Sequence, residues 1–319
     1  MKKIKWITTR QNGWVKSVLL FGLFTFLSFT SKAQCGIENI AFKSGEELAY
    51  DLYFNWKFIW MKVGTAEMDT KMVKYEGKDT WKSYLITRGN EKIDKFFVMR
   101  DTLLSYCDTD LSPIYFRKGA HEGDRYYVDE IWYSYPHGNC QLKKHRIDAD
   151  GEEHWKTSTY KSCIYDMMSI FLRARNFDPS KMKKNQTIPM PVSDASRLNN
   201  SWLEFRGREN YKMSDTKEKY RCVVFSFYER ENGKSKELLR FWVTDDNNHI
   251  PVRLDMFLSF GSAKAYLKSY KGVRSPMTSK IKCLFFELLN FIQIILTQVL
   301  PFVVGPVVGL GRHIGFPFV

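Results

Sequence analysis

The feature that most constrains this sequence is a repeated alternation of apolar and polar residues with a period of two. Within residues 47–56, apolar side chains share one face of an extended chain, at Leu48, Tyr50, Leu52, Phe54 and Trp56. The pattern recurs in residues 61–67, 81–87, 96–99, 103–107, 114–117, 126–135, 141–147, 154–160, 220–228, 237–244, 251–259 and 263–270. Such alternation is typical of strands with one buried face. An aromatic content of 16% also favours strands.

Turn signals separate these segments and predict antiparallel hairpins. Asp150-Gly151 and Asn232-Gly233 are dipeptides that form tight turns between strands, and Gly77 and Gly261 mark two further turns. In the segment 61–67, Gly64 and Ala66 leave room on one face. We therefore expect a mainly β (α+β) fold, in which a curved antiparallel sheet forms an open half-barrel with one or two covering helices.

One segment has helical periodicity instead. Its apolar residues fall at spacings of three and four, at Ile164, Met167, Met168, Phe171 and Leu172. Ser162 is the expected N-cap, Asp166 lies in the first turn, and Pro179 follows the end. Two interpretations stand: the methionines line a pliable ligand pocket, or the helix covers the core face of a sheet. The Pro-containing segment 188–191 is expected to be an extended linker.

The N-terminus predicts export. Residues 1–33 combine basic residues, an apolar run at 18–29 and the small residues Ser31 and Ala33, which is typical of a signal peptide cleaved before Gln34. Without these residues, which hold six Lys or Arg and no acid, the net charge falls from +14 to +8. That balance, with no long basic run, argues against nucleic acid as a partner. Export places the six cysteines in an oxidising compartment, where we expect one or two disulfides of undetermined pairing.

The domain prediction is a signal peptide at 1–33, a single β-rich domain at 34–280 with its core at about 42–272, and a hydrophobic tail at 281–319. Within this tail, residues 288–310 form an uncharged segment that is long enough to span a bilayer. Pro301 and Pro306 interrupt the segment. Three interpretations stay open: a kinked membrane span, a helix lying in the interface, or an appended reading frame. Membrane contact through residues 281–310 is thus one expectation.

Motifs for known chemistries are absent or incomplete, so no catalytic, metal or cofactor residue is assigned. The six histidines form no HExxH, and the sequence contains no GxSxG, P-loop or GxGxxG. Ser180 and Lys183 match S-x-x-K without its companion motifs. The acidic segment 148–153 lacks the ligands of a calcium loop and is better explained as a hairpin turn.

Paired carboxylates are the remaining route to catalysis, since a glycosidase needs only two. The candidates are Glu122 with Asp124, which would share a strand face, Glu46 with Glu47, and Asp245 with Asp246. The sequence gives no reason to prefer one pair.

Several segments resemble the exported bacterial family known as domain of unknown function 3108. They are Gly45-Glu46-Glu47-Leu48-Ala49-Tyr50, Val63-Gly64-Thr65-Ala66-Glu67-Met68, residues 165–173, Phe241-Trp242-Val243-Thr244-Asp245 with Ile250-Pro251-Val252-Arg253, and residues 261–267. The resemblance covers about residues 42–272, and it implies no activity. The strand order with one helix is also similar to periplasmic lipoprotein carriers of the LolA and LolB type, which are open half-barrels that accept acyl chains.

The sequence therefore predicts an exported protein of the periplasm or outer envelope that binds a lipid, a lipoprotein or another apolar ligand without catalysing a reaction. Two alternatives from other classes are a carboxylate-dependent envelope hydrolase and a structural module that binds protein partners. A buried acid with a raised pKa in the concavity would favour the hydrolase, and an apolar groove would favour the carrier.

Overall fold

The computed structural model describes residues 35–281, apart from 57–58, 96, 215 and 259–260. The predicted signal peptide, its cleavage site and the hydrophobic tail from residue 282 lie outside the described residues. Within the described part, no helix is long and apolar enough to cross a membrane.

Strands dominate the described residues. In chain order they are β1 (Glu46–Trp56), β2 (Ile59–Tyr75), β3 (Lys78–Gly89), β4 (Met99–Cys107), β5 (Pro113–Glu122), β6 (Arg125–Ser134), β7 (Cys140–Ile147), β8 (Glu153–Tyr160), β9 (Thr187–Pro189), β10 (Val192–Ser193), β11 (Leu198–Asn199), β12 (Ser201–Lys212), β13 (Lys219–Glu231), β14 (Lys234–Thr244), β15 (Pro251–Leu258), β16 (Gly261–Lys271) and β17 (Lys280–Ile281). The helices are α2 (Glu91–Asp94) and α3 (Met167–Ala174), with 3-10 turns at Pro136–Gly138 and Pro179–Lys181.

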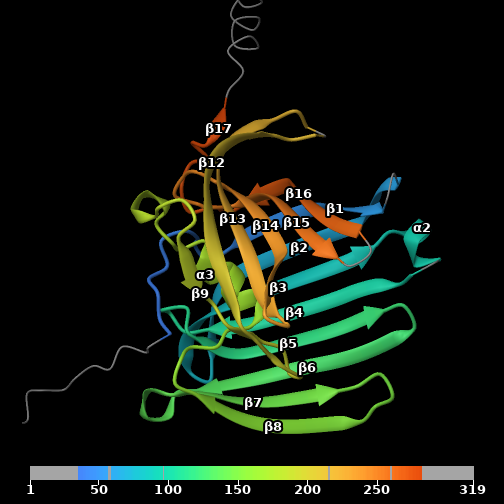
Figure 1. Ribbon diagram of the computed structural model, residues 1–319, viewed down its shortest axis with the longest axis vertical. Coiled ribbons are helices and arrows are strands. Elements are labelled where there is room, and N and C mark those ends of the chain that lie inside the picture. Colours follow the sequence, from blue (N-terminus) through green and yellow to red (C-terminus); the bar gives the residue numbers. More distant parts are fainter. Residues whose placement is uncertain (1–34, 57–58, 96, 215, 259–260, 282–319) are drawn as a thin grey trace, which may run out of the picture.

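Fifteen of the strands form one antiparallel sheet. Its hydrogen-bonded order runs β8-β7-β6-β5-β4-β3-β2-β1-β16-β15-β14-β13-β12-β9, so β1 and β16 join the two halves of the chain at the centre (Figure 1). The path ends at β8 and β9 and does not close. The predicted fold class, a curved open antiparallel sheet, is confirmed.

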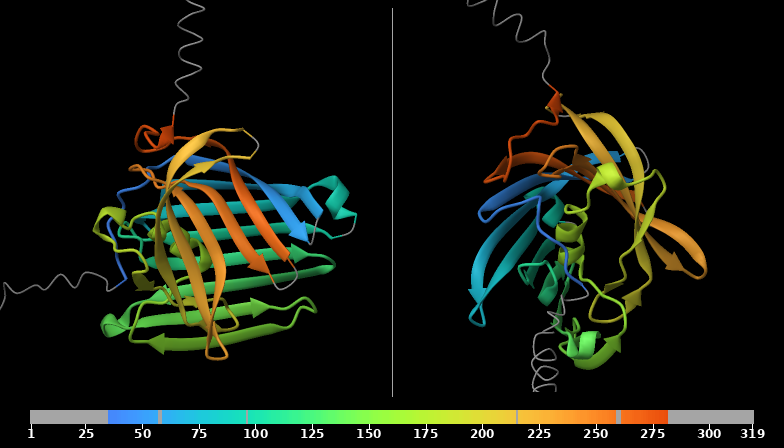
Figure 2. Two further views of the ribbon diagram at one scale, coloured as in Figure 1. Left: turned by 45° about the horizontal axis from the view of Figure 1, so that its top comes forward. Right: turned by 90° about the vertical axis from the view of Figure 1, so that its left-hand side faces the viewer.

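The sheet curves around α3. Figure 2 shows this helix between the half formed by the early strands and the half formed by β12–β16. Asp166 caps the helix, because its side chain accepts from the backbone N–H groups of Met168 and Ser169 at 2.9 and 2.8 Å. The expected Ser162 cap is therefore wrong, and the helix begins later, at Met167. Its end before Pro179 is confirmed.

The predicted hairpin turns are present. Asn232 and Gly233 have φ values of 50° and 77° between β13 and β14, which is the pair of left-handed conformations that a type I′ turn requires. The Asp150-Gly151 turn joins β7 to β8 as expected. Turn chemistry therefore sets the register of these two strand pairs.

Three elements differ from expectation. The strand β12 was not predicted, although it pairs with β13 along its whole length. The strand expected at 96–99 is not found among its described residues, because 97 and 98 lie outside any strand and Met99 begins β4. Pairing also continues beyond residue 270, since Lys280 and Ile281 of β17 pair with Tyr220 and Lys219 of β13.

The core lies on the inner face of the sheet and against α3. It contains Phe42, Leu48, Phe116, Ile131 and Leu172, all nearly inaccessible to solvent. A second cluster packs beneath β12–β14.

A disulfide between Cys35 and Cys163 ties the N-terminal segment to the chain before α3. Among the other described cysteines, Cys107, Cys140 and Cys222 are buried free thiols. Cys222 belongs to the core, where it packs as a small buried hydrophobe.

Candidate functional site

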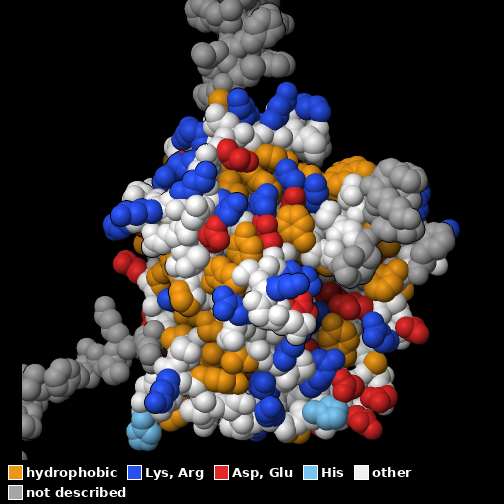
Figure 3. Space-filling view, viewed as in Figure 1, with side chains coloured by type: hydrophobic (Ala, Val, Ile, Leu, Met, Phe, Trp, Pro, Cys, Tyr) orange, Lys and Arg blue, Asp and Glu red, His pale blue; other side chains and the backbone are white. Residues whose placement is uncertain are grey.

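An apolar groove of about 240 Å3 lies between the inner face of the sheet and α3. Both halves of the sheet contribute to it, through β1–β4 and β12–β16, and helix α3 forms one wall. Its lining residues are predominantly aliphatic or aromatic, at Tyr50, Leu52, Ala66, Met68, Leu85, Thr87, Leu103, Met167, Met168, Ile170, Phe171, Ala174, Arg175, Leu203, Phe225, Leu239, Phe241, Val243, Pro251, Leu254, Met256 and Ala265. Figure 3 shows hydrophobic side chains gathered on one face of the molecule, with Lys and Arg around them.

Strand register places the groove's lining residues side by side. Leu52 of β1 lies opposite Ala265 of β16, and Tyr50 lies opposite Ala66 of β2. The two alanines occupy positions where larger side chains would fill the space beside α3. The room predicted at Ala66 is therefore part of the groove.

Two methionines stand at the exposed edge of the groove. Met167 of α3 is 49% exposed and Met256 of β15 is 36% exposed, yet both line the cavity. Met168 is buried and lines it as well. The helix therefore covers the core face, as one interpretation expected, and its methionines also line a cavity with flexible, polarisable side chains.

A fully buried ion pair borders the groove. Arg175, at the end of α3, donates to both carboxylate oxygens of Glu46, at 2.5 and 2.9 Å, and to the carbonyl of Asn248 at 2.9 Å. Both side chains are 1% exposed. The guanidinium also lies over the ring of Phe42. This pair fixes the end of α3 against β1 and so fixes the width of the groove.

The hydroxyl of Tyr50 has no hydrogen-bond partner among the described residues, although it is buried. Burial raises the pKa of Tyr50, with the charges of Arg175 and Glu46 as smaller influences. The side chain therefore remains a neutral phenol at physiological pH, able to donate one hydrogen bond into an otherwise apolar space.

Beside the groove, charged side chains begin on the inner face at Lys118 of β5. Lys118 of β5 lies opposite the groove residue Leu103, and its ammonium donates to the Tyr127 hydroxyl at 2.7 Å and to Glu122 at 3.2 Å. Farther along, Asp129 of β6 pairs with Arg146 of β7 at 3.2 Å. The concave surface thus joins an apolar groove to a polar network.

Thr87 and Asp101 lie at the boundary between these two parts. They are directly opposite each other on β3 and β4. Thr87 lines the groove. Its hydroxyl and one carboxylate oxygen of Asp101 are both inaccessible and without a hydrogen-bond partner in the described part of the chain. Burial raises the pKa of Asp101 to about 6, against the opposing effect of the Lys118 charge.

The carboxylate pairs proposed from the sequence are not brought together as acid and base. Glu122 ends β5 and Asp124 lies in the following turn, so the prediction that they share a strand face is wrong. Glu46 is buried against Arg175, whereas its neighbour Glu47 is half exposed and 3.8 Å from Lys271. The pleat separates them, because adjacent strand residues point to opposite faces.

The third pair organises a loop. Asp245 forms an ion pair with Arg208 at 3.1 Å. Asp246 accepts from the hydroxyl of Thr244 and from the backbone N–H groups of Asn248 and Ser279. These bonds hold the turn before β15 and the segment that leads to β17.

The weaker motifs also have local structural partners. The Ser180 hydroxyl donates to Asp178 in the turn after α3. Asp148, in the acidic segment, bonds with Arg146 and His154 at the β7–β8 turn. The interpretation of this segment as a hairpin turn is confirmed, and no group of three or more metal-ligating side chains occurs among the described residues.

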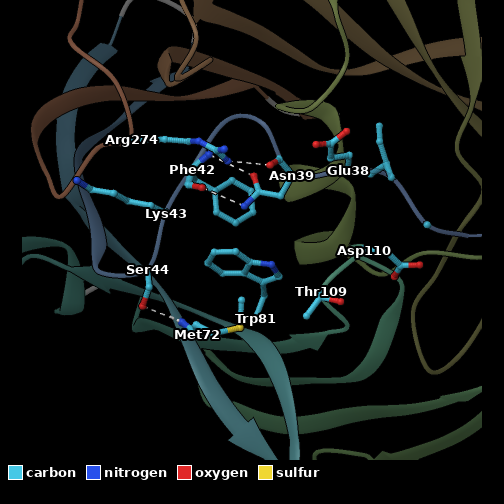
Figure 4. Close-up of a pocket in the computed structure, with 12 residues that line it drawn as sticks. Glu38, Asn39, Phe42, Lys43, Ser44, Met72, Trp81, Thr109, Asp110 and Arg274 are labelled. Carbon is cyan, nitrogen blue, oxygen red and sulfur yellow. Dashed lines mark hydrogen bonds between the residues drawn. The ribbon is translucent and has the colours of Figure 1, made fainter.

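A second depression, of about 630 Å3, lies near the N-terminal segment (Figure 4). The rings of Phe42 and Trp81 meet edge to face in it, with centroids 4.9 Å apart. Several of its polar groups serve the backbone: Arg274 donates to the carbonyl of Asn39, and Ser44 accepts from the N–H of Met72. The apolar groove is the better candidate, because its buried polar groups at Tyr50 and Thr87 are unpartnered.

Sequence reasoning missed the residues that define this site. Glu46 was considered as a catalytic acid only beside Glu47, and Arg175 was not singled out, since their 129-residue separation hides the contact. Thr87 and Asp101 were not singled out. Strand alternation was the available signal, but only the register between β3 and β4 shows that they are neighbours.

Three solved structures have low similarity to this chain. A β-barrel-like protein of domain of unknown function DUF1849 from Brucella abortus has a TM-score of 0.46 and 13% identity, covering 72% of this chain and 99% of its own. A protein described as exported, with a YmcC-like fold, from Bacteroides fragilis has a TM-score of 0.30 and 9% identity, and the match covers 74% of this chain and 100% of the other. One described as a lipoprotein, from Parabacteroides distasonis, has a TM-score of 0.32 and 10% identity, with coverages of 74% and 99%.

No curated protein matches the chain. A family model described as protein of unknown function (DUF3108) matches residues 49–268, which contain most of the sheet, helix α3 and the whole of the groove's lining. The resemblance seen in the sequence is confirmed, and the chain belongs to the DUF3108 family.

Proposed function

We propose that this protein is an exported protein of the cell envelope that binds a lipid or another apolar ligand in the groove, without catalysing a reaction. The observation that carries the proposal is the groove itself: an apolar lining contributed by both halves of the sheet, and exposed methionines at its edge. Concave apolar sites with few polar groups are typical of small-ligand binding.

The size of the groove suits part of an alkyl chain. An apolar protein cavity of about 150 Å3 holds one benzene molecule, so 240 Å3 has room for roughly eight to ten carbon atoms of a chain. Burying one methylene contributes about 0.8 kcal/mol, so about eight contribute roughly 6 kcal/mol before the entropy cost of binding. A free energy of about 6 kcal/mol corresponds to a Kd of roughly 40 μM, so after the entropy cost the groove alone should bind a single alkyl chain no more tightly than tens of micromolar.

A fluorescent apolar probe without a charged head group, N-phenyl-1-naphthylamine, tests the proposal. We expect saturable binding to the mature protein, with a blue shift as the probe leaves water. Ala265→Phe should weaken binding at least tenfold, because the ring would occupy the groove. Ala149→Phe, at an exposed turn position, is the matched control. Equal affinity in both variants and the wild type would contradict the proposal.

One observation favours a second candidate, an envelope hydrolase. Asp101 lies beside the groove with a raised pKa of about 6, which is suited to general acid or base catalysis near neutral pH. A p-nitrophenyl ester of an eight-carbon acid tests this candidate directly. Turnover that disappears in Asp101→Asn, but not in Asp124→Asn, would support hydrolysis over simple binding.

Residues 281–310 extend the proposal to membrane contact, with a lipid or a lipoprotein as the partner that delivers or receives the ligand. The mature chain should then sediment with vesicles, and a chain ending at Cys283, which keeps β17, should not. Equal sedimentation of the two would contradict membrane contact through the tail.

A further inference from the structure

The groove has a polar boundary at Thr87 and Asp101, which constrains the polar group that its ligand can carry. One cross-strand row runs from Tyr50 on β1 through Ala66 and Thr87 to Asp101 on β4, since each is the register partner of the next. Directly opposite partners on an antiparallel sheet have Cβ atoms about 5 Å apart. The Asp101 carboxylate therefore lies next to Thr87, which lines the apolar groove.

Thr87 and Asp101 are both incompletely bonded. The hydroxyl of Thr87 and one carboxylate oxygen of Asp101 are buried atoms that lack a hydrogen-bond partner within the described residues. Buried polar atoms in folded proteins nearly always have hydrogen-bond partners. Because these two neighbouring atoms have none within the described residues, we expect their partner to be a bound molecule that is not part of the chain. An ionised carboxylate can only accept, whereas a hydroxyl can also donate.

The nearby cation does not fill this role. Lys118 interacts electrostatically with Asp101, but its ammonium is engaged by the Tyr127 hydroxyl at 2.7 Å and by Glu122 at 3.2 Å. Tyr127 also donates to Glu122, at 3.1 Å. The three side chains form a closed network beside Asp101, and none of them supplies a hydrogen bond to its unpartnered oxygen.

We propose that the ligand is a single-chain amphiphile whose polar head carries a hydrogen-bond donor, a hydroxyl or an ammonium, bound between Thr87 and Asp101. This inference rests on the proposed function, because the chain of the amphiphile occupies the groove. A hydroxyl head accepts from Thr87 and donates to Asp101, and an ammonium head donates to both oxygens. A carboxylate head offers no donor and meets the charge of Asp101.

Three probes with the same twelve-carbon chain test the head group by calorimetry on the mature protein: dodecylammonium, 1-monolauroylglycerol and laurate, each below its micelle concentration. We expect either donor probe to bind at least tenfold more tightly than laurate, because a hydrogen bond to a charged group is worth about that much. Whichever of the two binds more tightly identifies the head as amine or alcohol.

Variants separate the head group from the chain. Asp101→Asn should abolish the preference over laurate, and Thr87→Val, which keeps the side-chain shape, should weaken the monoglyceride by about fivefold. Asp124→Asn, in the exposed β5–β6 turn, should leave all three affinities unchanged. A thermal melt confirms that each variant is folded.

The outcomes distinguish this inference from the function beneath it. Equal binding of all three probes, unaffected by Thr87→Val and Asp101→Asn but lost in Ala265→Phe, would overturn the head-group assignment and leave the groove function standing. Tighter binding of laurate would also overturn the assignment. Failure of every probe to bind would overturn both.

Discussion

Removing the charge of Glu46 tests whether its buried ion pair with Arg175 stabilises the fold and fixes α3 against the sheet. Glu46→Gln keeps the shape of the side chain, but it leaves the Arg175 guanidinium buried without a balancing charge. The two groups are each 1% exposed and make two hydrogen bonds, at 2.5 and 2.9 Å. Removal of one partner from a buried pair of this kind costs about 3–5 kcal/mol.

We expect a value near the lower end of that range. The glutamine oxygen can still accept one bond from Arg175, and the carbonyl of Asn248 retains its own. A loss of about 3 kcal/mol should lower the melting temperature by roughly 6–12 °C in a domain of this size. Because Arg175 ends α3 and lines the groove, affinity for an apolar probe should fall as well.

Urea unfolding followed by tryptophan fluorescence measures the effect, and Glu47→Gln is the matched control. Glu47 is the adjacent residue, is half exposed, and lies 3.8 Å from a largely exposed Lys271, so its loss should change stability by less than about 0.5 kcal/mol. A Glu46→Gln/Arg175→Met double variant should lose less than the sum of the single changes. If Glu46→Gln costs under 1 kcal/mol, the pair does not anchor α3 and the reasoning is wrong.

Three further changes test the fold. Asp166 is fully buried and burial raises its pKa to about 6, so its carboxyl should contribute a loss of stability of about 3 kcal/mol as the pH rises from about 4 to about 6. Asp166→Asn keeps an N-cap but removes this contribution, so in urea titrations the wild type should lose about 3 kcal/mol more than the variant over that range, and equal losses would contradict the reasoning. Gly233→Val should cost about 1 kcal/mol or more, since φ is 77° there, and an unchanged melting temperature would place the turn elsewhere. Replacing Cys35 and Cys163 by Ser should destabilise the protein by about 3–5 kcal/mol, because the bridge closes a loop across 128 positions; equal urea midpoints for the variant and the oxidised wild type would contradict this.

The architecture could be predicted because its signals are local. Period-two alternation marked most strands, and Asn232-Gly233 marked a hairpin whose backbone has the expected positive φ values. By contrast, β12 was missed. It contains Gly207 at a bulge in its pairing with β13, and its exposed residues from Arg206 onward weaken the alternation.

The site could be predicted only in part, because its defining contacts are long-range. The two methionines of the helix were correctly associated with a pocket, since helical spacing placed them on one stripe. No local pattern brings Glu46 to Arg175 or places Asp101 opposite Thr87. The carboxylate pairs failed for the opposite reason: adjacency in sequence suggested proximity, but the strand pleat and a turn separated the side chains.

Native mass spectrometry of the protein purified from its own envelope tests the central claim most directly. The account predicts one bound single-chain amphiphile per protein chain, released on collisional activation and greatly reduced in Ala265→Phe but not in Ala149→Phe. It further predicts a head group with a hydroxyl or an amine. A protein that carries no ligand from its native membrane, or a ligand retained equally by the two variants, would contradict the claim that the groove is a binding site.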